Sequence, residues 1–141
     1  MKKMLDFFTT NDHFARHCGI ELIEAKPGWA KARMVIRPYH FNGANTVHGG
    51  AIFTLADFAF AVAANSSGQL SLAVNTSTSF VKAALNGTLH AVAEEICTNR
   101  RLGHYQVRIT DDQNELIATF QGTAYRKEAT LFEQSPTEPN S

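Results

Sequence analysis

The sequence predicts an α+β domain in which a curved antiparallel sheet wraps around one long central helix. One continuous apolar segment, residues 50–64, suits a buried helix of ~22 Å and is short for a bilayer span. Later segments alternate apolar and polar residues at the period of a strand, with turn residues between them. With 141 residues and 44% apolar content, the chain can fill one core. We expect a single domain over residues 1–128 and a disordered tail over 129–141.

The N-terminal part of the chain predicts a short helix followed by a β-hairpin. Asn11 or Asp12 can cap a helix that runs through His17, and Gly19 supplies the left-handed residue that ends it. The next two segments alternate in polarity across a Pro-Gly turn, as paired strands do. These strands are expected at residues 20–25 and 30–37.

After a polar loop at residues 38–47, the apolar segment forms the central helix, and residues 65–68 end it. Because the connections between the later strands are short, we expect an antiparallel meander. Its strands are predicted at residues 70–81, 89–97, 104–110 and 115–126. Small residues recur at inward positions and would let the sheet curve closely around the helix: Ala91, Ala93, Ala118, Gly122 and Ala124.

Composition narrows the classes of function. Thirteen basic and thirteen acidic side chains cancel, and no basic block appears, so we expect no nucleic-acid partner. Asp6 and the polar residues after it interrupt any signal-peptide core, which predicts a cytoplasmic protein without a membrane partner. Cys18 and Cys97 are too few for a disulfide framework and are expected to be reduced, packed thiols.

Asp57 is the only charged residue in the apolar segment. Burial of an unpaired carboxylate costs several kcal/mol or raises its pKa, so such a residue is paired, solvated by a pocket, or used in chemistry. An ion pair with a distant arginine is the structural alternative. The absence of polar neighbours favours a catalytic carboxylate.

The junction between loop and helix carries a second signal. Paired glycines in His48-Gly49-Gly50 leave the first amide groups of the helix accessible, and the helix dipole favours negative charge there. Alone, the tripeptide is also typical of a flexible turn. Together with Asn42 and Asp57 it combines oxyanion donors, polar positioning groups and a base or nucleophile.

The segment from Phe41 to Asp57, with residues 65–68 and 116–125, resembles the hotdog-fold acyl-CoA thioesterases of the phenylacetate-degradation (PaaI) type. The resemblance covers nearly the whole domain. It implies a hotdog fold and hydrolysis of an aryl- or medium-chain acyl-CoA to free acid and CoA. It also implies that no cofactor is needed beyond the coenzyme A of the substrate.

The resemblance also implies roles for individual residues. Asp57 would be the general base or the nucleophile, and the Gly50 N–H would polarise the thioester carbonyl. Asn42 would orient water or the carboxylate, and His48 would hydrogen-bond near the thioester. Some relatives carry a hydroxyl where Ala73 stands here, so a nearby polar residue would replace it. The residues expected to bind substrate are Gly49, Asn75, Thr76, Ser77, Lys82, Arg100 and Arg101.

Helix geometry predicts that the site is shared between two chains. Gly50 and Asp57 are separated by ~10 Å along one helix axis, whereas reacting atoms need to approach within ~3 to 3.5 Å. A homodimer with antiparallel helices would bring Asp57 of each chain to the glycine turn of the other. The resembled family forms such dimers, which often pair into homotetramers.

Other arrangements are less well supported. His13 and His17 have i, i+4 spacing but lack the glutamate of the zincin motif, so no metal is expected. No Gly-x-Ser-x-Gly nucleophile elbow occurs. A hotdog 3-hydroxyacyl dehydratase or hydratase remains the alternative enzyme. A non-catalytic acyl-CoA-binding regulatory module would be expected to lack Asp57.

Overall fold

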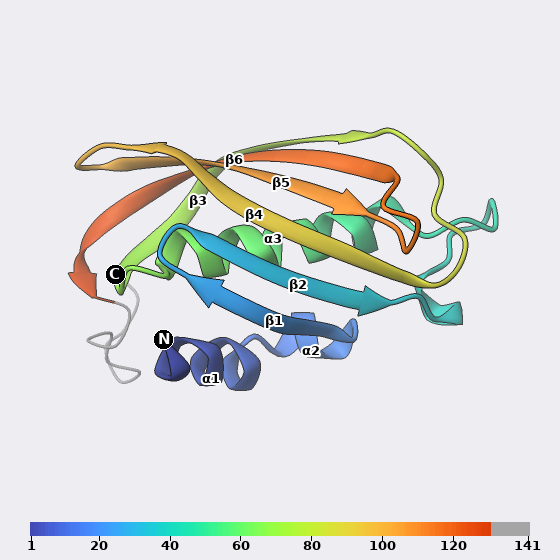
Figure 1. Ribbon diagram of the computed structural model, residues 1–141, viewed down its shortest axis with the longest axis horizontal. Coiled ribbons are helices and arrows are strands. Elements are labelled where there is room, and N and C mark those ends of the chain that lie inside the picture. Colours follow the sequence, from blue (N-terminus) through green and yellow to red (C-terminus); the bar gives the residue numbers. More distant parts are fainter. Residues whose placement is uncertain (131–141) are drawn as a thin grey trace.

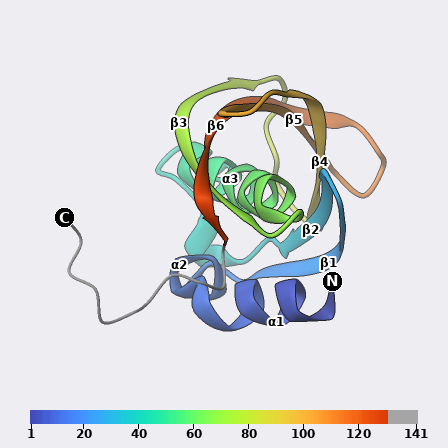
Figure 2. The same cartoon turned by 90° about the vertical axis from the view of Figure 1, so that its left-hand side faces the viewer.

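A six-stranded antiparallel sheet curves around helix α3 (Gly49–Asn65) in the computed structural model, which describes residues 1–130 (Figures 1 and 2). This confirms the predicted α+β class and the wrapped central helix. The strands are β1 (Ile20–Lys26), β2 (Trp29–Val35), β3 (Gln69–Phe80), β4 (Thr88–Thr98), β5 (Leu102–Thr110) and β6 (Leu116–Thr130). β6 thus continues past the predicted domain boundary at residue 128, and the rest of the predicted tail lies outside the described residues.

Two N-terminal helices lie beside β1, on the side of α3 away from the centre of the sheet (Figure 2). The side chain of Asp12 accepts from the N–H of Ala15 at 3.0 Å and caps α2 (His13–His17), and Gly19 has a φ of +79°. Both features were predicted. Helix α1 (Lys2–Asn11) was not predicted; its buried Phe8 contacts Phe58 of α3 edge to face. No helix in residues 1–130 is both long and apolar enough to cross a membrane.

The predicted four-strand meander is wrong at its first strand. The strand order is β1-β2-β4-β5-β6-β3, so β3 pairs with β6 and not with its sequence neighbour β4. The connection over residues 81–87 is too long for a tight hairpin. The N–H groups of Val81 and Lys82 donate to the carbonyl oxygen of Ile117, and the carbonyl oxygen of Ala84 accepts from the N–H of Val47. The connection then enters β4, which pairs with β2. Because this connection crosses the N-terminal end of α3, β3 and β4 lie on opposite sides of the helix.

Small residues let the sheet lie close to α3, as predicted. The inward alanines of β4 and β6 are fully buried, and Gly122 is buried beside Phe60. A Cβ atom at Gly122 would lie 2.8 Å from the Phe60 ring, so glycine is required for this close approach. Phe60 also contacts Tyr105 and Phe120, which centres the core on the middle of α3.

One stripe of α3 is not covered by the described residues, which corrects the expectation of a buried helix. Gly50 and Phe53 are exposed, and Thr54, Asp57 and Ala61 are partly buried. These residues recur at helical spacing and therefore form one open face. Cys97 of β4 also differs from prediction, because it is exposed and not packed.

Candidate active site

A tight loop carries the chain from β2 to α3, and Asn42 supplies its internal hydrogen bonds. The Asn42 side-chain oxygen accepts from the N–H groups of Ala44 and Thr46 at 2.9 and 3.2 Å. A backbone bridge between Phe41 and Val47 closes the loop. The Asn42 side chain is therefore engaged in shaping the loop and does not project freely toward a water molecule.

His48 caps α3 with its side chain. Its Nδ1 atom accepts from the N–H of Gly50 at 2.8 Å, so a neutral His48 ring carries its proton on Nε2. His48 is exposed, which leaves Nε2–H open to a ligand. Within residues 1–130 the N–H of Gly49 has no hydrogen-bond acceptor. The first turn of α3 thus presents one occupied amide and one unoccupied amide at its positive end.

Asp57 lies on the open face of α3, about two helical turns beyond Gly50. No group in the described part of the chain donates a hydrogen bond to its carboxylate. Burial raises the pKa of Asp57 above the ordinary value of 3.8, and the negative charge of Asp12 raises it further. Among the described residues no arginine forms an ion pair with Asp57, so the carboxylate has no protein partner there.

Two cavities flank the glycine turn. The larger, about 640 Å³, has His48 and Gly50 in its wall together with the aromatic rings of Phe14, Tyr39 and Phe41. The smaller, about 360 Å³, is lined by Asn42, Gly49 and Lys82, among others. The turn therefore separates an aromatic cavity from a cavity with a cationic side chain.

The polar residues predicted on β3 divide between its two faces. Thr76 pairs with the buried Gly122 and faces α3, whereas Asn75 and Ser77 pair with Thr123 and the exposed Gln121 on the outer face. Sequence reasoning missed Thr78, which pairs with the buried Phe120 and so shares the inner face. Its Oγ1 atom is buried without a hydrogen-bond partner among the described residues.

The cations predicted to contact coenzyme A do not converge within one chain. Lys82 lies near the N-terminal end of α3 and forms ion pairs with Glu115 and Asp111. Arg100 and Arg101 lie in the turn at the far end of β4, roughly 30 Å away along the strand. The Arg101 guanidinium donates to the Tyr125 hydroxyl at 2.9 Å.

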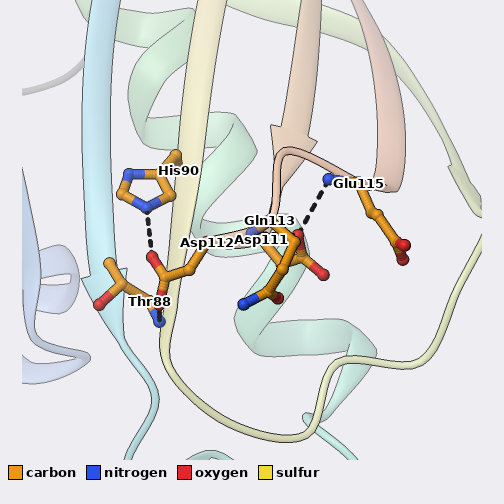
Figure 3. Close-up of polar contacts among 6 residues, drawn as sticks. All are labelled: Thr88, His90, Asp111, Asp112, Gln113 and Glu115. Atoms are coloured by element: carbon orange, nitrogen blue, oxygen red, sulfur yellow. Dashed lines mark hydrogen bonds and ion pairs between the residues drawn. The ribbon is translucent and has the colours of Figure 1, made fainter.

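A histidine–carboxylate pair on the outer face of the sheet is structural (Figure 3). His90 Nε2 lies 2.9 Å from Asp112, whose other carboxylate oxygen accepts from the N–H of Thr88. These bonds lower the pKa of Asp112 and fasten the β5–β6 turn to β4. Gly87 has a φ of +82°, a left-handed conformation that favours glycine, and a Cβ atom there would also lie 2.5 Å from the Asp112 carboxylate.

The fold and the site together define a class of enzyme: a hotdog domain with an open carboxylate and a glycine turn at the start of its central helix. Residues 44–118 match the thioesterase superfamily. The chain belongs to this family and is a PaaI-like thioester hydrolase.

Two relatives illustrate the similarity. An Archaeoglobus fulgidus protein is 39% identical over 127 residues, which cover 89% of this chain and 82% of that protein. The acyl-coenzyme A thioesterase PaaI of Escherichia coli is 34% identical over 122 residues, covering 86% of this chain and 87% of PaaI. The solved structure of Escherichia coli PaaI has a TM-score of 0.88 at 32% identity and covers 92% of this chain and 94% of that one.

Proposed function

We propose that the protein hydrolyses the thioester of an aryl- or medium-chain acyl-CoA to a free acid and coenzyme A. The unpartnered Asp57 carboxylate on the open face of α3 is the observation that carries this proposal. The name of the Escherichia coli relative supports the acyl-CoA substrate. The chemistry requires water but no cofactor. We also propose a cytoplasmic location.

Asp57 supplies the negative oxygen that the reaction needs. As a general base it takes a proton from water, whose oxygen attacks the carbonyl carbon; the C–S bond then breaks, and the leaving thiolate takes up a proton. As a nucleophile it attacks the carbonyl carbon itself and expels the thiolate. Water then hydrolyses the resulting mixed anhydride. A raised pKa makes the carboxylate a better base than an ordinary aspartate.

The first turn of α3 stabilises the oxyanion. Gly50 N–H can act as the donor if the carbonyl oxygen of the substrate displaces His48 Nδ1 from it. Gly49 N–H needs no such displacement; it lies in the wall of the smaller cavity and would be the alternative donor for a carbonyl bound from that side. His48 Nε2–H faces the same aromatic cavity and can hydrogen-bond near the thioester. Asn42 contributes by holding the loop that precedes this turn.

The two cavities suggest how the substrate lies. Aromatic rings in the larger cavity suit an aryl acyl group or a medium alkyl chain. The pantetheine part of the substrate would contact Gly49, Thr76 and Lys82. It would reach Asn75 and Ser77 from the outer face of the sheet. Lys82 must exchange a carboxylate partner for a phosphate to do so. Since Arg100 and Arg101 lie far from Lys82 in one chain, they would serve a site formed with another subunit.

The active site is proposed to be shared across a two-fold dimer. Gly50 and Asp57 are ~10 Å apart along α3, too far to act on one carbonyl within a chain. Within the described residues, strand β3 pairs only with β6 and forms a free edge of the sheet, with Leu72, Val74 and Phe80 exposed. Antiparallel pairing of two β3 edges would bury these side chains and the open face of α3. Pairing of dimers would give the proposed homotetramer.

A panel of acyl-CoA thioesters tests the function by release of free thiol. We expect cleavage of aryl- or medium-chain substrates, with kcat lowered at least ~10²-fold in Asp57→Asn, which is nearly isosteric but cannot act as a base. The same preparations are assayed for hydration of an enoyl-CoA. Hydration without thiol release would identify a hydratase, and wild-type turnover by Asp57→Asn would reject the mechanism.

A further inference from the structure

His40 is a buried histidine whose two ring nitrogens both bond to the backbone. Only 3% of the residue is exposed. Its Nδ1 atom accepts from the N–H of Arg37 at 2.9 Å, and its Nε2 atom lies 2.7 Å from the carbonyl oxygen of Cys18. A carbonyl can only accept, so the ring is the neutral tautomer with its proton on Nε2. The ring therefore joins the end of α2 to the short 3₁₀ helix Pro38–His40.

The main chain of His40 continues this connection to the proposed active site. Its carbonyl oxygen accepts from the N–H of His48 at 2.7 Å. The His48 ring in turn accepts from the N–H of Gly50 at 2.8 Å. Three successive hydrogen bonds thus run from Cys18 through His40 and His48 to the first turn of α3.

We propose that His40 is the positioning residue that holds the His48–Gly50 turn in its reactive geometry. The turn is exposed at His48 and Gly50, so few packing contacts restrain it. His40 supplies a rigid ring that bonds to Cys18, a residue backed by α2 and β1. His40 lines the same aromatic cavity as His48. It cannot exchange a proton with a ligand without giving up a backbone bond, which makes it a positioning residue and not an acid or base.

Three substitutions separate the two ring bonds. His40→Asn keeps an acceptor near the position of Nδ1 and loses the bond to Cys18. His40→Gln keeps an amide donor near the position of Nε2, and His40→Phe keeps the ring and loses both bonds. Ile109→Val is the matched control, because it removes one methyl group from a fully buried core position on β5, outside the site.

Amide hydrogen exchange measured by NMR is the primary readout and does not depend on the proposed reaction. In the Asn and Phe variants we expect exchange at His48 and Gly50 to accelerate about tenfold, the scale of one net hydrogen bond. The Gln variant should stay within about threefold of wild type. Ile109→Val should lower the melting temperature without a selective change at these two amides.

Kinetics form the second arm, which rests on the proposed thioester hydrolysis. The Asn and Phe variants should lose about ten- to hundredfold in kcat with a smaller change in KM, because a misplaced oxyanion donor weakens transition-state binding most. The Gln variant should recover most of the activity. If the wild type cleaves no acyl-CoA, the proposed function fails, while the exchange data still decide the role of His40.

Three results would overturn the positioning role. The first is wild-type exchange and kcat in both the Asn and the Phe variants. The second is an equal kcat loss in Ile109→Val, which would assign the effect to general stability. The third is the opposite tautomer of His40 in the wild-type protein, which would contradict the assigned bonds. Two-dimensional NMR of the ring nitrogens measures it and should show protonated Nε2 and unprotonated Nδ1.

Discussion

The N–H of Gly50 donates to Nδ1 of His48 across 2.8 Å, so the first turn of α3 is closed by the side chain that precedes it. The neighbouring N–H of Gly49 has no acceptor in residues 1–130. A substrate oxygen would therefore compete with the His48 ring for the N–H of Gly50, but would have no competitor for the N–H of Gly49. This difference makes the two glycines separately testable.

Replacement of Gly49 by proline tests the unoccupied amide. His48 has a ψ of 134°, which suits the residue before a proline, and proline is tolerated at the first helical position. If the Gly49 N–H binds the oxyanion, kcat should fall ~10² to 10³-fold. Gly49→Ala is the control, since it keeps the N–H and meets the same Phe80 ring at 3.1 Å. Equal kcat values for the two variants would exclude this amide as a donor.

Replacement of Asp12 by asparagine should move the pH dependence of the reaction. Asp57 must be ionised to act, so kcat/KM falls as pH drops through its raised pKa. Asp12→Asn removes one of the two causes that raise this pKa, and the acid limb should shift to lower pH. Asparagine preserves the cap of α2. Asp6→Asn removes the same charge from an exposed position and should leave the acid limb of the kcat/KM profile unchanged. An equal shift of that limb in both variants would contradict a local effect of Asp12.

Subunit exchange between two inactive variants tests the shared site. Asp57→Ala removes the carboxylate, and Asn42→Ala removes the hydrogen bonds that shape the loop. With random mixing, half of the dimers are mixed and one of their two sites is intact, so about a quarter of wild-type activity should return. Mass spectrometry of the mixed dimers verifies exchange. Continued inactivity after verified exchange would reject a site built from two chains.

A charge on the free edge of β3 should prevent dimer formation. Val74 is 60% exposed at this edge, and lysine there would oppose pairing of two β3 strands. We expect Val74→Lys to sediment as a folded monomer with little activity. Ile23→Lys, on the other edge strand β1, should remain dimeric and active. A dimeric, active Val74→Lys would show that β3 is not the interface.

Local patterns predicted most elements because polarity alternation and helix capping depend on neighbours in sequence. The α2 cap, the left-handed Gly19 and the later strands all follow from such patterns. Helix α1 escaped prediction because its buried residues, Met4 and Phe8, pack on distant parts of the chain. The pairing of β3 with β6 was not predicted, because the sequence does not indicate that the connection after β3 crosses the end of α3.

The same division holds for the candidate site. Asp57 could be identified because a single charge stands out in an apolar segment. The glycine turn could be identified because its residue types are unusual for a helix start. His40 and Thr78 carry no such local signal, and the local signal of Asp12 identifies it only as a helix cap. The role of His40 depends on the Cys18 carbonyl, and that of Thr78 on its place opposite Phe120.

The sequence by itself determined the fold class, the limits of the central helix and the carboxylate on it, since these depend on the order of polar and apolar residues. Only the tertiary structure decided that β3 is a free edge, that one face of α3 is open, and that His48 already occupies the Gly50 N–H. The physical reason is that burial and hydrogen bonding depend on which distant groups meet in space. These groups meet only when the sheet and its loops fold around α3, and no local sequence pattern encodes that arrangement.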